Sequence, residues 1–182
     1  MNNYDDIKHL TRPQYDDLHS MSMHDSRVEL TEKGTAMRFT EIDLQIDDIM
    51  WFGVDINGFI FACTSAGIAN VPEFVCASKE QTELIEDYFT EKLEKTTSAV
   101  LEAPYVDNPL MRDAVGLAEK GVFSFDAVTD NIEHNGEYVK IVSPRTPIRY
   151  AALPDDIKKL MRDNAVSVDV MKEKYIYVKH AY

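Results

Sequence analysis

Ser65 lies in the part of the chain that comes nearest to a catalytic motif. The sequence CTSAG at residues 63–67 matches the G-x-S-x-G elbow that presents a nucleophilic serine, except that a cysteine replaces the first glycine. The elbow needs a strand that turns sharply into a helix, and the next residues, IANVP, do not have a helical pattern. A strand end followed by a loop is therefore the preferred interpretation. A serine hydrolase with Ser65 as nucleophile and His134 or His180 as base is kept as an alternative.

No group of residues has the spacing of a metal or nucleotide site. His19 and His24 are five residues apart, which puts their side chains on different sides of a helix, whereas ligands on one face are four apart. The chain contains neither G-x-G-x-x-G nor a Walker sequence. We therefore predict that no metal ion and no cofactor is bound, and we favour a non-catalytic protein.

Negative charge dominates the composition. The formal net charge is −13, and residues 1–100 alone carry 19 acidic and eight basic side chains. Nucleic acids bind to clustered basic side chains, and a negative surface repels their phosphates. We therefore predict no nucleic-acid partner. Solubility alone would explain the charge, and a basic protein partner is the functional alternative.

Five carboxylates are the predicted binding residues. On the helix expected after Ser78, Glu83, Asp87 and Glu91 follow one another at intervals of four, so that neighbouring like charges repel. A lysine at one of these positions would stabilise the helix, so keeping the acids is compatible with an attractive surface for a basic partner. Asp43 and Asp47 add to the same predicted acidic face.

The sequence predicts a cytoplasmic protein. Its first ten residues, MNNYDDIKHL, do not form a signal peptide, and its apolar runs are too short to span a bilayer. Cys63 and Cys76, the two cysteines, lie among apolar residues. We predict that both thiols are reduced and that Cys63 is buried.

Periodicity and turn signals predict the elements around the acidic face. Thr11 and Pro13 indicate a short helix, and alternating apolar residues over 42–46 predict a strand. Asn57-Gly58 between two apolar runs predicts a hairpin with a two-residue type I′ turn. In that register Val54 faces Phe61 and Phe52 faces Cys63 on one buried face, while Trp51 lies on the other face, most simply as a further core residue.

Further signals complete a prediction of an α+β fold. Ser78 predicts one helix start, with Gln81 as its capping-box partner. Further helices are predicted between Asn108 and Gly121 and from Pro154, and strands over 122–127, 138–142 and 175–180. The expected architecture is a mainly antiparallel sheet built from hairpins with three or four helices. We expect one domain over residues 1–182, with residues 1–26 loosely attached.

One pattern resembles a known class of proteins. Trp51, Asp55 and Gly58, followed by Thr64-Ser65-Ala66-Gly67 and Pro72, give W-x-x-x-D-x-x-G … T-S-x-G … P. This is similar to small bacterial α+β proteins, some of them of the immunity type found beside toxin genes. Phe125-Asp126-Ala127, Tyr138 and Pro144 are similar to the later part of that pattern. The resemblance implies a binding protein and assigns no site residues.

The sequence therefore favours a cytoplasmic protein-binding protein with an acidic face, of the immunity or scaffold type. A serine hydrolase using Ser65 is the first alternative. A module that binds a small ligand is the second, and it requires a pocket that only a structure can reveal.

Overall fold

The computed structural model of the chain describes residues 36–106, 108–129 and 136–179. Contacts between residues divide the chain after Thr35, and all the elements described below belong to the unit from Ala36 to Tyr182. The helix predicted near Thr11, the loose attachment predicted for residues 1–26 and the histidines His19 and His24 lie outside the described residues.

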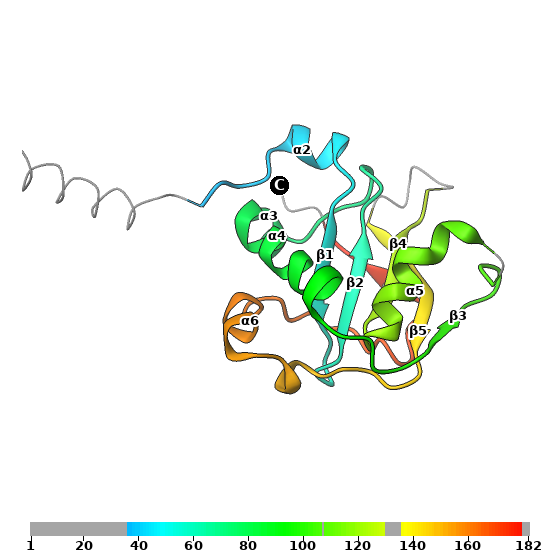
Figure 1. Cartoon of the computed structure of the whole chain (residues 1–182). Coiled ribbons are helices and arrows are strands. Elements are labelled where there is room, and N and C mark those ends of the chain that lie inside the picture. The colour runs from blue at the N-terminus through cyan, green and yellow to red at the C-terminus, as the bar shows by residue number, and fades with distance from the viewer. Residues whose placement is uncertain (1–35, 107, 130–135, 180–182) are drawn as a thin grey trace, which may run out of the picture. The chain divides into compact units, whose positions relative to one another are not determined.

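The described residues contain a mixed six-stranded sheet (Figure 1). Its order is β1-β2-β4-β5-β3, and β6 pairs with the part of β5 that β3 leaves uncovered. The β2–β4 pair is parallel and the other pairs are antiparallel. The predicted α+β class is confirmed, although the sheet is not purely antiparallel. The strands are β1 Met50–Val54, β2 Ile60–Thr64, β3 Ala99–Leu101, β4 Phe123–Ala127, β5 Glu137–Pro144 and β6 Tyr175–Tyr177.

The helices α4 and α5 cover one face of this sheet. Figure 1 shows α4 and α5 side by side in front of the strands, where α4 contacts β1 and α5 contacts β4 and β5. The α-helices in the described part of the chain are α2 Glu41–Ile46, α3 Glu73–Cys76, α4 Lys79–Asp87, α5 Arg112–Glu119 and α6 Asp155–Leu160. A π-helix, η2 (Tyr88–Lys92), continues α4, and the 3-10 turns are η3 (Pro109–Met111) and η5 (Tyr150–Ala152).

The strand predicted over residues 42–46 is wrong, because this segment is the helix α2. Thr40 and Asp43 form a reciprocal capping box: the Thr40 side chain accepts from the Asp43 N–H, and the Asp43 carboxylate accepts from the Thr40 N–H. The two hydrogen bonds satisfy amides at the start of the helix. The capping box at Thr40 favours a helix, and it outweighs the alternation of Ile42, Leu44 and Ile46 that predicted a strand.

The hairpin predicted at Asn57-Gly58 is confirmed, and its register is wrong by one residue. Trp51 pairs with Cys63 and Gly53 with Phe61, where the prediction paired Phe52 with Cys63. A shift of one residue moves the side chains of one strand to the other face relative to those of its partner strand. Trp51 and Phe61 therefore share a face, and Val54 is only partly buried.

Asp55 explains the observed register. The Gly58 N–H donates to the Asp55 carbonyl and Gly58 has φ +79°, so the loop is a type I turn followed by a glycine bulge. The Asp55 side chain, which is 5% exposed, accepts hydrogen bonds from the N–H groups of Asn57 and Phe59 at 2.9 and 2.7 Å. It also accepts from the Val170 N–H at 3.2 Å. These bonds favour a three-residue loop over the predicted two-residue turn.

The sheet has a core on each face. On the helix-covered face Phe52 stacks on Phe89 of η2, with ring centroids 4.6 Å apart. On the opposite face Trp51 is fully buried, and its indole N–H donates to the Tyr138 hydroxyl. Tyr138 in turn donates to the Asn70 carbonyl at 2.7 Å. The prediction that Trp51 is a core residue is confirmed.

The predicted helix starts at Ser78 and Asn108 and the predicted helix end at Gly121 are confirmed. Ser78 caps α4 by accepting from the Gln81 N–H, Asn108 caps η3, and Gly121 ends α5 with φ +93°. The Gln81 side chain does not close the predicted capping box, because it donates to the Leu160 carbonyl at 2.6 Å. Cys63 is buried, as predicted, Cys76 is buried as well, and both are free cysteines.

Gly58 and Gly116 provide a matched test of the hairpin turn. A Cβ would meet no atom within 4 Å at either position, but only Gly58 has a positive φ. Gly58→Ala should lower the free energy of unfolding by about 1–2 kcal/mol, because an L-residue is strained there. Gly116→Ala, in helix α5, should raise it by about 0.5–1 kcal/mol. Urea unfolding of both variants measures the difference, and shifts of the same sign would contradict the assigned turn.

Candidate functional site

Helix α2 exposes apolar side chains. None of its residues is fully buried, and Ile42 and Ile46 are 68% and 72% exposed. Only Leu44 packs, partly buried, against the core of the sheet. A helix of this length is unstable by itself, so contacts outside it must hold it in place.

Asp43 provides the main contact that holds α2. Its carboxylate forms an ion pair with Lys79 at 2.9 Å, and the Lys79 N–H donates to the Met37 carbonyl at 2.8 Å. The hydrogen bond from Lys79, followed by those from Thr40, lowers the pKa of the Asp43 carboxyl to about 2. Asp43 therefore joins α2 to the start of α4.

The other predicted binding carboxylates occupy neighbouring elements. Asp87 forms an ion pair with Lys92 at 2.5 Å. Asp47, Glu83 and Glu91 are exposed, and within the described ranges they form no ion pair. Glu83 lies on α4, whereas Glu91 lies on η2 and lines the groove described below. The structure thus separates the five predicted residues into two fixed by partners and three available ones.

Asp48 lies close enough to two further carboxylates, Glu86 and Asp126, to act on both. Burial raises the pKa of the Glu86 carboxyl, and the negative charges of Glu83 and Asp48 raise it further. Burial also raises the pKa of Asp126, to which Asp48 contributes. The charges that raise the pKa values of Glu86 and Asp126 are those of other carboxylates. Asp48, Glu86 and Asp126 therefore form an acidic cluster beside the start of β1 and the C-terminal end of β4. Sequence spacing does not reveal it, because Asp48, Glu86 and Asp126 come from separate elements.

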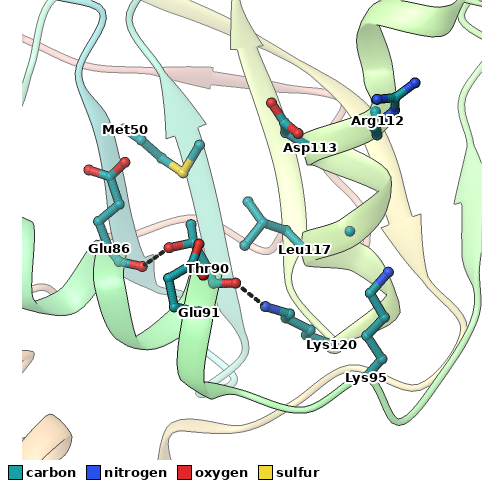
Figure 2. Close-up of a pocket in the computed structure, with 10 residues that line it drawn as sticks. Met50, Glu86, Thr90, Glu91, Lys95, Arg112, Asp113, Leu117 and Lys120 are labelled. Carbon is teal, nitrogen blue, oxygen red and sulfur yellow. Dashed lines mark hydrogen bonds between the residues drawn. The ribbon is translucent and has the colours of Figure 1, made fainter.

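A groove separates α4 and η2 from α5 (Figure 2). Its volume is about 510 Å³, within the range of ligand pockets. Met50 and Leu117 provide apolar surface, and Gly116 leaves open space on the α5 side. The remaining lining residues are Glu86, Thr90, Glu91, Lys95, Arg112, Asp113 and Lys120.

Lys120 holds the two walls of this groove together. Its ammonium donates to the Phe89 carbonyl at 2.9 Å and to the Thr90 carbonyl, both in η2. Lys120 is 8% exposed, and burial lowers the pKa of its ammonium. A cation next to the last carbonyls of a helix is favourable, because these lack partners within the helix. Short π-helices occur frequently at functional sites, and η2 forms one wall of this groove.

Ser65 is placed as a structural residue. Its side chain is fully buried, and its hydroxyl oxygen accepts from the N–H groups of Ile49 and Gly67 at 2.9 and 3.4 Å. The hydroxyl therefore stabilises the loop after β2 and is shielded from a substrate. His134 and His180, the suggested bases, lie outside the described residues.

The described part of the chain contains no group of three or more His, Cys, Asp or Glu side chains suited to a metal ion. In the same residues no helix has the length and apolar character needed to cross a membrane.

Removing the charge of Glu86 should stabilise the protein at neutral pH. The folded-state pKa of Glu86 is raised, so its ionisation weakens the fold as pH rises through the ordinary carboxyl range. Glu86→Gln should therefore raise the free energy of unfolding by about 0.5 kcal/mol at pH 7, and this difference from the wild type should disappear near pH 4. Thermal unfolding from pH 4 to 8 measures it, with the exposed Glu94→Gln as control. A gain independent of pH would contradict the explanation.

Lys120→Met should destabilise the protein by about 2–3 kcal/mol, since two carbonyls lose a charged donor. Lys95→Met is the matched control, because Lys95 forms an exposed ion pair with Glu119 whose loss costs at most about 1 kcal/mol. Equal losses in urea unfolding would show that Lys120 does not hold the walls together.

Comparison with known proteins leaves the predicted resemblance untested. No family model matches the chain, and no curated protein or solved structure is similar enough to count as a match.

Proposed function

We propose that this protein is a non-catalytic binding protein that recognises a basic partner protein through the surface of α2 and α4. The surface consists of the exposed apolar side chains Met37, Ile42 and Ile46, together with the exposed carboxylates of Asp47, at the end of α2, and Glu83, on α4. An apolar centre with a polar rim is the usual anatomy of a protein interface.

The exposure of Ile42 and Ile46 is the observation that carries this proposal. A surface helix normally buries its apolar side chains, and here the helix is held by Thr40, Asp43 and Lys79 while both isoleucines face solvent. Stability alone does not account for that arrangement. Exposed apolar patches of this kind mark interaction surfaces.

The charge of the surface supports a basic partner. Asp47 and Glu83 have no ion-pair partner within the described ranges, and the negative charges of Glu83 and Asp48 both act on Glu86. Complementary fields of this kind chiefly raise the association rate and the discrimination between partners. On this proposal the protein acts in the cytoplasm of a bacterium as an immunity protein or a scaffold. Where a toxin-like reading frame lies next to its gene, the product is the first partner to test.

The proposal predicts separate effects of apolar and charged substitutions. Ile42→Ala with Ile46→Ala should weaken capture of the basic partner about tenfold, because each removes a contact at the interface centre. Asp47→Lys with Glu83→Lys should slow association markedly at about 50 mM salt and have little effect at about 300 mM, where exposed charges are screened. Both effects are measured with the partner immobilised on a sensor surface, from the association and dissociation rates of each variant.

Leu110→Ala is the matched control, because Leu110 is 82% exposed on η3, a different element. It should leave capture unchanged, and all three variants should keep the wild-type melting temperature within a few degrees. Binding that survives both double substitutions would exclude the α2–α4 surface as the interface.

A further inference from the structure

We infer that the open edge of β6 pairs with β6 of a second copy of this chain and joins the two copies into a twofold-symmetric dimer. Within the described ranges β6, Tyr175–Tyr177, pairs with β5 and with no other strand. The inference is independent of the proposed function, because none of the residues that form this edge belongs to the surface of α2 and α4.

The backbone of β6 has unpaired hydrogen-bonding groups along its outer edge. In an antiparallel pair, alternate residues bond to the neighbouring strand, and the residues between them point away from it. The Val178 N–H donates to the Gly136 carbonyl, so Ile176, two residues earlier, also bonds to β5. Tyr175 and Tyr177 therefore direct their N–H and C=O groups outward, and no other described residue bonds to these groups.

An apolar hollow adjoins this edge. Its volume is about 390 Å³, and it lies between β6 and residues 166–169. Ile56 and Tyr177 line the hollow and are 64% and 71% exposed. Exposed apolar and aromatic side chains beside an open strand edge are typical of a site where a further strand is added to a sheet.

A second copy of β6 matches the outward groups of the first. In a twofold-symmetric antiparallel pair, Tyr175 of each copy lies opposite Tyr177 of the other copy, and the two residues exchange both of their backbone hydrogen bonds. This register satisfies every outward group of β6 in both copies. It also places tyrosine side chains opposite one another on the same face, which is a favourable cross-strand contact.

The charges that flank β6 favour the same register. Glu173 precedes Tyr175 by two residues and Lys179 follows Tyr177 by two, so Glu173 of each copy lies opposite Lys179 of the other copy. Both side chains are exposed, and within the described ranges neither forms an ion pair. Opposite charges in directly opposed positions stabilise a strand pair. Charge complementarity therefore identifies a second copy as the occupant of this edge.

The other lysines near β6 do not oppose this pairing. Lysines at an open strand edge often prevent contact with another sheet. Lys172 forms an ion pair with Asp169 at 2.8 Å, and the Lys174 ammonium lies 5.4 Å from the centre of the Tyr175 ring. In the proposed register Lys174 lies opposite Val178 of the other copy, so it meets no like charge in the directly opposed position.

Sedimentation equilibrium of the full chain tests for the dimer. One short strand from each copy forms a small interface, so we expect a dissociation constant in the range of about 10 µM to 1 mM. The amide protons of Tyr175 and Tyr177 should exchange more slowly at high than at low protein concentration, because they gain acceptors only in the dimer. A chain that stays monomeric throughout this range, or a dimer that leaves these amides unprotected, would overturn the inference.

Charge reversal tests the register. Glu173→Lys should weaken the dimer by a factor of about five or more, because it places two lysines opposite each other in both symmetry-related pairs. Lys179→Glu should weaken it to a similar extent. The double variant, Glu173→Lys with Lys179→Glu, should restore the wild-type dissociation constant, which residues that act only within one chain would not do. Losses that add in the double variant would rule out the register.

A proline substitution tests the backbone contact. Tyr177→Pro removes an outward N–H and no hydrogen bond to β5, so it should abolish the dimer and keep the fold. Ala99→Pro is the matched control, because the Ala99 N–H points outward in the same way on the edge strand β3. Ile42→Ala with Ile46→Ala should also dimerise like the wild type. A dimer that is lost in either control and retained in Tyr177→Pro would place self-association on another surface.

Discussion

The hydrogen bonds of the Asp55 carboxylate determine which face of the sheet each side chain of the hairpin occupies. By accepting from two amides of the turn and from the Val170 amide, Asp55 favours a three-residue loop. The resulting register puts Trp51 in one core and Phe52 in the other. It also places Met50 on the helix-covered face, where it contributes apolar surface to the groove. The groove therefore depends on a turn at the opposite end of β1.

A second buried polar contact shapes the same face. Lys120, at the end of α5, donates to carbonyls of η2 and so sets how closely the two helices approach. A cation just before a helix-ending glycine is a common local pattern, explained by the helix dipole. Here its hydrogen bonds go to a different helix, so the same residue joins two elements that are far apart in sequence.

The acidic residues serve several physical purposes, although they are alike in sequence. Asp43 positions α2 through Lys79, and Asp87 is paired with Lys92. Glu83 and Asp47 are exposed and form no ion pair within the described ranges, while Glu86 and Glu91 line the groove. Charge spacing along the helix after Ser78 predicted an acidic face but did not distinguish these environments, because each depends on which cation the fold brings near.

The sequence by itself determined the features that arise from contacts over a few residues. These include the cap at Ser78, the helix stop at Gly121, and the existence of the hairpin at Asn57-Gly58. The hydrogen bonds of the cap, the helix stop and the turn join residues at most five positions apart, so the local pattern contains both partners. Only the tertiary structure decided the parallel β2–β4 pair and the groove, and it added the Val170 amide to the two local amides that bond to Asp55 in the turn. In each case the deciding partner, such as Val170 for Asp55 or Phe89 for Lys120, is brought close only by folding.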